Sequence, residues 1–234
     1  MQILNISEIP SEPFLNPRRL RIWVTARNSF IGLNILEQLD YDFVATTHKD
    51  LDLTNSEAVS VFLKDLYFDY VIHTACVGGR RNDSDDIKIF DDNYDMFENL
   101  LNNQDHFGYL INFGSGADQL NTWYGKAKRV IRGIIKVKPE MVNLRCFGVW
   151  GKYEKPDRFP ATCIISDEIT IDEDKLMRYI HVDGLVKIVD SIIKNWPKTK
   201  REITVGEPIL LSDFAKQLNP NIKVIIKGKG EDYV

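Results

Sequence analysis

The chain has 234 residues, of which 44% are hydrophobic and 27% charged. This balance is typical of a globular protein and excludes a disordered chain, a collagen-like repeat and a coiled coil. The net charge of −4 supplies no general positive field for a nucleic-acid backbone.

We expect neither a membrane span nor an export signal in this sequence. No stretch approaches the roughly 20 apolar residues of a membrane span, and residues 1–20 lack the basic start and apolar run of a secretory signal. Cys76, Cys146 and Cys163 are odd in number and far apart, which fits neither a disulfide framework nor a zinc site. We therefore expect a cytoplasmic protein with reduced, structural cysteines and without a metal, membrane or nucleic-acid partner. Residues 1–20 are expected to form an N-terminal extension of unassigned role.

From residue 21 onward, short apolar runs typical of strands alternate with segments of helical periodicity. We expect strands at 21–26, 41–47, 70–75, 109–113 and 141–147, and helices at 31–39, 56–67, 84–102, 123–136 and 182–194. This alternation predicts an α/β fold with a doubly wound, Rossmann-like parallel sheet. We expect a dinucleotide-binding domain over residues 21–148. Residues 149–234 are expected to form a small, loop-rich substrate lobe with elements that return to the main domain.

The turn after the first strand occupies the place where a dinucleotide-binding fold carries glycines over the pyrophosphate. Only Gly32 is a glycine here, while Ala26 and Ser29 stand at the other two glycine positions. Both are small enough for close backbone approach, and Ser29 could offer its hydroxyl to a phosphate. An ordinary strand-to-helix turn is an equally good interpretation of this motif taken alone. The expected cofactor contacts in this turn are Thr25, Arg27, Asn28, Ser29, Phe30 and Ile31.

The second strand ends in Thr46-Thr47-His48-Lys49, without the acidic residue that binds the 2′-hydroxyl of NAD ribose. The missing acid and the basic residues His48 and Lys49 favour NADP over NAD, although the same residues would also suit a solvated loop. Asp52 and Leu53, just beyond, are expected to meet the adenine.

Ser115, Tyr124 and Lys128 form the strongest candidate catalytic group. Ser115 ends a predicted strand, and the spacing of four places Tyr124 and Lys128 on one face of the next helix. A nearby ammonium lowers the pKa of a phenol from about 10, so that the phenol can pass a proton to a developing alkoxide. Ser115 would hydrogen-bond the same oxygen. A Tyr-x-x-x-Lys pair alone is often surface decoration, but its order within a doubly wound fold favours an active site.

At these residues the chain resembles the extended short-chain dehydrogenase/reductases, above all the enzymes similar to GDP-L-fucose synthase and rhamnose synthase that act on nucleotide-linked 4-keto sugars. The likeness covers about residues 21–218. It rests further on Thr25 with Phe30-Ile31-Gly32, His73-Thr74-Ala75-Cys76-Val77-Gly78-Gly79, Asn93, Leu144-Arg145, Gly151, Tyr179-Ile180-His181-Val182-Asp183 and Val205-Gly206-Glu207-Pro208.

The resemblance implies hydride transfer between a nicotinamide and a carbonyl. It implies that Tyr124 is the acid/base, that Lys128 also binds the nicotinamide ribose, and that Ser115 orients the carbonyl. Thr74 and Ala75 would line the cofactor site. A homodimer formed through the helices at 84–102 and 123–136 is a further implication.

Two departures from the family pattern narrow the reaction. Related epimerases place a cysteine two residues after the serine, where this chain has Ala117, and related dehydratases place an Asp-Glu pair where it has Gly116-Ala117. Neither proton-abstracting set is visible. Serine, tyrosine and lysine suffice for simple carbonyl reduction, or for inversion of an alcohol through a transient ketone.

The substrate pocket is also expected to differ from the family pattern. Gly148 stands where the family has an asparagine, and Met177 stands where it has an arginine, with Arg178 one place later. Any single arginine could equally be a solvated surface residue. The expected substrate contacts are Gly78, Arg80, Arg81, Arg158 and Arg178.

These observations predict an NADP-dependent reductase of a 4-keto nucleotide-linked sugar. The altered glycine turn keeps open a non-catalytic, nucleotide-binding or regulatory member of the family. A C4 epimerase of a nucleotide sugar, which would consume no cofactor overall, is the third hypothesis.

Overall fold

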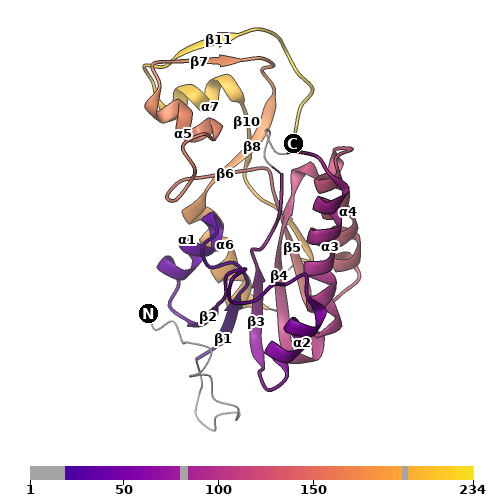
Figure 1. The fold of residues 1–234 in the computed structure, drawn as a ribbon. Coiled ribbons are helices and arrows are strands. Elements are labelled where there is room, and N and C mark those ends of the chain that lie inside the picture. Colours follow the sequence, from indigo (N-terminus) through magenta and orange to yellow (C-terminus); the bar gives the residue numbers. More distant parts are fainter. Residues whose placement is uncertain (1–18, 80–83, 197–199) are drawn as a thin grey trace.

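The structure is a computed structural model that describes residues 19–79, 84–196 and 200–234. Its centre is a six-stranded sheet in the order β2-β1-β3-β4-β5-β9, in which every neighbouring pair is parallel (Figure 1). The strands are β1 (Arg21–Val24), β2 (Asp42–Ala45), β3 (Phe68–His73), β4 (Phe107–Ser115), β5 (Met141–Cys146) and β9 (Glu202–Thr204).

Helices cover both faces of this sheet. On one face lie α1 (Phe30–Gln38) and α6 (Val182–Asn195), and on the other lie α2 (Ser56–Leu63), α3 (Ile87–Asn102) and α4 (Trp123–Lys136). The two-residue period of β1 shows how the sequence builds two cores: Ile22 and Val24 pack toward α1 and α6, whereas Trp23 packs toward α2, α3 and α4. The predicted α/β doubly wound fold is confirmed.

Capping residues set the helix starts. The predicted helix at 123–136 matches α4 residue for residue, and Asn55 caps α2 by accepting from the Ala58 N–H at 3.0 Å. Helix α3 begins at Ile87 rather than at residue 84, because the Asp86 carboxylate accepts from the Lys88 N–H at 2.8 Å. Strand β9 was not predicted.

The C-terminal part of the chain forms a lobe beside the carboxyl ends of the sheet strands (Figure 1). We expected a loop-rich lobe, but residues 152–174 contain a helix and a strand. The lobe contains β6 (Gly148–Trp150), α5 (Phe159–Ile165), β7 (Glu168–Ile171), β8 (Leu176–His181), β10 (Glu207–Leu210), α7 (Leu211–Leu218) and β11 (Lys223–Ile226). Strand β8 pairs with β6 and β10, and β7 pairs with β11. Between these elements, α6 and β9 return to the main sheet.

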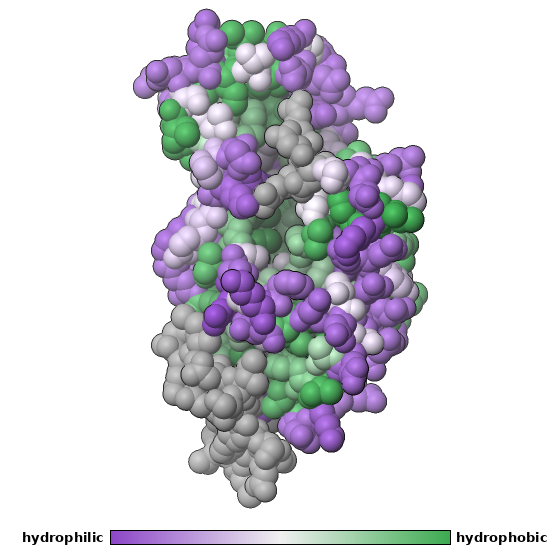
Figure 2. Space-filling view, viewed as in Figure 1, coloured by the Kyte–Doolittle hydropathy of each residue, from purple (hydrophilic) through white to green (hydrophobic). Residues whose placement is uncertain are grey.

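Two features of this fold locate the ligand side. The strand order reverses between β1 and β3, and ligands of open α/β sheets bind beyond the carboxyl ends of the strands at such a point. In the space-filling view the molecule narrows between the lobe and the main sheet, and its surface is hollowed there (Figure 2). None of the described helices is long and apolar enough to cross a bilayer.

Candidate active site

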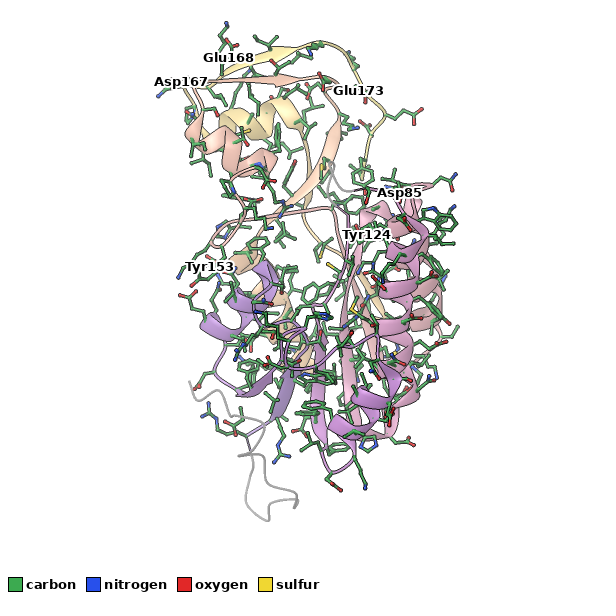
Figure 3. All side chains as sticks on the ribbon, in the orientation of Figure 1. Asp85, Tyr124, Tyr153, Asp167, Glu168 and Glu173 are labelled. Carbon is green, nitrogen blue, oxygen red and sulfur yellow. The ribbon has the colours of Figure 1, made fainter. Side chains whose placement is uncertain are left out.

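A pocket of about 190 Å³ opens at the carboxyl ends of β1, β3, β4 and β5. Tyr124 lies at this level, at the waist of the molecule between the lobe and the main sheet (Figure 3). The pocket brings together eight of the residues predicted from the sequence: Phe30, Ile31, Thr74, Ala75, Ser115, Tyr124, Lys128 and Arg158.

Ser115, Tyr124 and Lys128 meet in this pocket. Ser115 ends β4, and its hydroxyl accepts from the Ala117 N–H at 3.1 Å and hydrogen-bonds Tyr124. One turn along α4 from Tyr124, the Lys128 Nζ donates to the Phe113 carbonyl at 3.1 Å and lies 5.5 Å from the centre of the Tyr124 ring. The structure therefore places a hydroxyl, a phenol and an ammonium around one space.

Burial controls the charge states of this group. Burial raises the pKa of Tyr124 far above its ordinary value, while the hydrogen bond with Ser115 opposes the shift. Burial also lowers the pKa of Lys128. Our expectation that the ammonium would lower the phenol pKa is therefore not met, because desolvation outweighs the opposing hydrogen bond with Ser115. Tyr124 holds its proton at neutral pH, which is the state that a proton donor needs.

Thr25 joins the ends of β1 and β3 and does not line the pocket. Its hydroxyl oxygen accepts from the N–H groups of Thr74 and Ala75 at 3.1 and 3.2 Å. Its own proton is thus left for the Nδ1 of His73, 3.2 Å away. Burial, with the nearby Lys128 ammonium, lowers the pKa of His73 to about 3. A neutral His73 therefore forms part of the pocket wall.

The turn before α1 uses its side chains to hold itself together. The Ser29 hydroxyl accepts from the Gly32 N–H at 3.0 Å and donates to the Ala26 carbonyl at 2.8 Å. A Cβ on Gly32 would stand 2.2 Å from that carbonyl oxygen, so this position requires glycine. Ser29 acts as the cap of α1 and its hydroxyl is engaged within the turn, whereas Phe30 and Ile31 face the pocket.

Basic side chains gather where β2 ends. The Arg27 N–H donates to the carbonyl of Thr46 at 2.9 Å, which places Arg27 beside this strand end. His48 and Lys49 are exposed, and the His48 Nδ1 lies 3.6 Å from the Asp52 carboxylate. None of these residues lines the pocket itself.

Other predicted contacts also lie away from the pocket lining. Leu53 is buried, and its carbonyl accepts from the Asn99 amide at 2.8 Å. Asn28 is exposed, and Gly78 lies outside the lining with a φ of 75°.

The predicted arginines separate into three groups. Arg158 lines the pocket, 3.4 Å from Glu154 and 5.8 Å from the Phe30 ring centre. Arg178 donates to the Gly206 carbonyl at 2.8 Å within the lobe. Arg80 and Arg81 lie outside the described residues.

The loop after β3 is held against Tyr124. The Asn93 amide donates to the carbonyls of Val77 and Ile89 at 2.8 and 2.6 Å and accepts from the Val77 N–H at 3.2 Å. Gly79, with a φ of 85°, passes so close to Tyr124 that a Cβ would lie 2.7 Å from the ring carbon Cζ. The loop therefore fixes one side of the phenol.

An ion-pair network around the buried Asp118 supports the turn that follows Ser115. The Asp118 carboxylate accepts from Arg145 at 2.6 and 2.9 Å and from Arg132 at 3.1 Å. Arg132 also forms a two-pronged pair with Glu202 on β9, at 2.5 and 2.7 Å. The turn is thereby tied to α4, β5 and β9.

Sequence reasoning missed part of the pocket wall. Cys76, Cys146 and Phe147 line the pocket, and Cys76 is exposed rather than structural as we expected. Each lies at or just after the end of β3 or β5. The rule that ligands bind at strand ends would have found them. Among the described residues, no group of His, Cys, Asp and Glu side chains could hold a metal ion.

A doubly wound sheet with a serine at a strand end and a Tyr-x-x-x-Lys helix beside it is the architecture of the extended short-chain dehydrogenase/reductases. The chain belongs to the NAD dependent epimerase/dehydratase family, whose sequence pattern matches residues 22–206. The resemblance inferred from the sequence is confirmed.

Individual relatives are more distant. GDP-L-colitose synthase of Yersinia pseudotuberculosis is 31% identical over 103 residues, which are 41% of this chain and 33% of that protein. The matching segment thus spans only a third of this curated relative.

Solved structures share the fold at low identity. The GDP-mannoheptose C4 reductase of Campylobacter jejuni with NADP bound superposes with a TM-score of 0.77 at 16% identity, covering 92% of this chain and 89% of that one. The dTDP-4-dehydrorhamnose reductase of Bacillus anthracis in complex with NADP gives 0.74 at 18%, covering 91% and 85%. The GDP-L-fucose synthetase of Naegleria fowleri bound to NADP gives 0.72 at 14%, covering 97% and 89%.

Proposed function

We propose that this protein is an NADP-dependent reductase that converts a 4-keto nucleotide-linked sugar to its alcohol. The observation that carries the proposal is the protonated phenol of Tyr124, which lies with Ser115 and Lys128 at the pocket expected for a nicotinamide. The names of the relatives support the substrate class, since they include reductases of GDP-linked and dTDP-linked keto sugars.

The residues present fit a dinucleotide. Lys128 is 4% exposed and has three donor hydrogens, of which the described residues engage one, at the Phe113 carbonyl. The remaining donors would hold the ribose hydroxyls. The N-terminal turn of α1 would receive the pyrophosphate beside Phe30 and Ile31, since N–H groups and the helix dipole favour anions there.

The cofactor preference follows from charge at the end of β2. Arg27, His48 and Lys49 would face the adenosine ribose, while the Asp50 carboxylate at this strand end is engaged by the N–H and hydroxyl of Thr47, both at 2.8 Å. A 2′-phosphate would therefore be bound favourably, which supports NADP over NAD.

A bound nicotinamide would supply the hydride for the substrate carbonyl. Tyr124 donates its phenol proton to the oxygen on which negative charge develops, and Ser115 hydrogen-bonds that same oxygen. Lys128 then stabilises the phenolate that remains. Burial of Tyr124 and Lys128 keeps water from weakening these interactions.

Two further parts of the proposal are the residues that would bind the substrate diphosphate and the oligomeric state of the protein. Arg158 faces the pocket and would bind the substrate diphosphate, together with the other predicted contacts Gly78, Arg80, Arg81 and Arg178. We also infer a cytoplasmic homodimer formed through α3 and α4, where Ile87 and Val130 expose apolar side chains.

Tyr124→Phe tests the proposal, since it removes the proton donor and keeps the ring. Oxidation of NADPH should be followed with dTDP-linked and GDP-linked 4-keto sugars. We expect the variant to lose about 10²- to 10⁴-fold in turnover and to bind NADPH as tightly as wild type. Tyr67→Phe, at the opposite end of the sheet, is the matched control.

Three outcomes separate the hypotheses. Unchanged turnover in Tyr124→Phe would reject Tyr124 as the proton donor. Binding of NADPH by the wild-type protein without oxidation would identify a non-catalytic member of the family. Conversion of a nucleotide sugar to its C4 epimer without net loss of NADPH would identify an epimerase.

A further inference from the structure

The C-terminal segment runs along β8 at the pocket side of the lobe. The Tyr233 N–H donates to the Leu176 carbonyl at 2.8 Å, and the Asp232 carboxylate accepts from the Leu176 N–H at 3.0 Å. Tyr233 also pairs with Met177 in a parallel bridge. In Figure 1 the C-terminus lies between the lobe and the upper end of α4. None of these bonds uses the Tyr233 side chain, so they hold residue 233 in place whatever side chain it carries.

The Tyr233 ring meets a residue of the pocket wall. Its centre lies 5.1 Å from that of Phe147, with the two rings at 72° to each other, an edge-to-face arrangement. Phe147 cannot withdraw, because Arg145 lies 4.8 Å from its ring and Gly116 leaves no space on its side: a Cβ there would be 2.2 Å from the Phe147 ring. Tyr233 is not itself among the residues that line the pocket, but it packs against Phe147 from the lobe and so extends the pocket wall on that side.

The phenol of Tyr233 lies near the reacting groups. It interacts electrostatically with Tyr124, with Asp118 and with Arg145. Burial raises the pKa of Tyr233, so the hydroxyl is protonated and can both donate and accept. No hydrogen bond joins that hydroxyl to any residue in the described ranges. A half-buried hydroxyl of this kind favours a polar ligand group.

The groups around the Tyr124 phenol come from two directions. Cys76, Ser115 and Cys146 stand at or beyond the ends of the sheet strands, whereas Tyr233 approaches from the lobe. The space between them is where a substrate carbonyl must lie to receive a proton from Tyr124.

We propose that Tyr233 is a specificity-determining residue that closes the lobe side of the pocket and hydrogen-bonds a hydroxyl of the sugar next to the reacting carbonyl. This inference rests on the proposed function. Tyr233 touches a part of the sugar that does not react, so it contributes equally to binding of the substrate and of the transition state.

Tyr233→Phe tests the hydrogen bond. With the keto sugar nucleotide that the wild-type protein reduces, we expect KM to rise about tenfold while kcat and the Kd for NADPH stay as in wild type. A purely structural role would instead lower the unfolding temperature without separating KM from kcat. Tyr67→Phe again serves as the control. An unchanged KM in Tyr233→Phe overturns the proposed contact.

A second measurement remains informative if the wild-type protein reduces none of the sugars, a result that would reject the proposed function alone. Tyr233→Ala should open the pocket and speed alkylation of Cys146 by N-ethylmaleimide several-fold, measured by mass spectrometry. Cys163, which is fully buried in the lobe, serves as the internal control. Equal labelling of Cys146 in Tyr233→Ala and wild type overturns the assignment of Tyr233 as a pocket wall.

Discussion

Gly79→Ala adds a single methyl group. Its effect on catalytic turnover should be distinguishable from its effect on folding stability. Gly79 has a φ of 85°, where an L side chain costs about 1–2 kcal/mol of folding free energy. The added Cβ would lie 2.7 Å from the Tyr124 Cζ, whereas carbon atoms pack at about 3.5–4.0 Å. The ring that carries the phenol must therefore move by about 1 Å. A displacement of this size at a reacting group costs about 10²-fold in rate, or about 2.7 kcal/mol of barrier.

The assay pairs NADPH oxidation with thermal unfolding. Gly78→Ala is the matched variant, since Gly78 has a φ of 75° but its added Cβ meets the flexible Ile89 side chain at 2.9 Å and not Tyr124. Both variants should lose similar stability, and Gly79→Ala should lose far more turnover. Equal losses of turnover would show that backbone strain is the cause. Full activity of Gly79→Ala would refute the conclusion that catalysis depends on the position of the Tyr124 phenol.

Two further changes test the surroundings of the site. Because the pKa of His73 is lowered to about 3, native His73 stays neutral while the unfolded chain takes up a proton near pH 6.5. The stability that depends on neutral His73 is complete above pH 6.5 and falls below it, by about 2 kcal/mol at pH 5. His73→Gln keeps an acceptor for Thr25 and should flatten the pH dependence of the free energy of unfolding, measured with urea. An unaltered pH dependence would contradict the assignment of native His73 as neutral. Asn93→Ala removes three hydrogen bonds, two of them to Val77, and should cost about 3 kcal/mol in the same experiment. Asn195→Ala, on an exposed helix end, should cost far less, and equal losses would argue against the role of Asn93 as a clamp.

The sequence predicted those parts of the fold whose signals are local. Helix α4 matches its predicted range over its full length, and the structure shows that Thr122 caps it by accepting from the Gly125 N–H at 3.0 Å. Helix α5 was missed because Pro156 and Pro160 suggested a loop, yet Pro160 stands in the first turn of α5, where its missing N–H costs nothing. Strand β9 has three residues, and only its pairing with β5 makes it a strand.

The same distinction applies to the site. Spacing along one helix and a strand end sufficed to bring Ser115, Tyr124 and Lys128 together as candidates. The position of Tyr233 could not be predicted, because it depends on how the lobe folds back over the sheet. Nor could the sequence show that Ser29 would use its hydroxyl to close its own turn. Hydrogen-bonding capacity can be read from a residue type, but its partner depends on tertiary structure.

The ion-pair network beneath the Ser115 turn has a consequence for synthesis on the ribosome. Asp118 and Arg132 emerge long before Glu202, the carboxylate that completes the network from β9. Until that acidic residue is translated and its strand docks, Arg132 lacks one of its two partners. The nascent chain therefore carries all three candidate catalytic side chains well before their supporting turn reaches its final form.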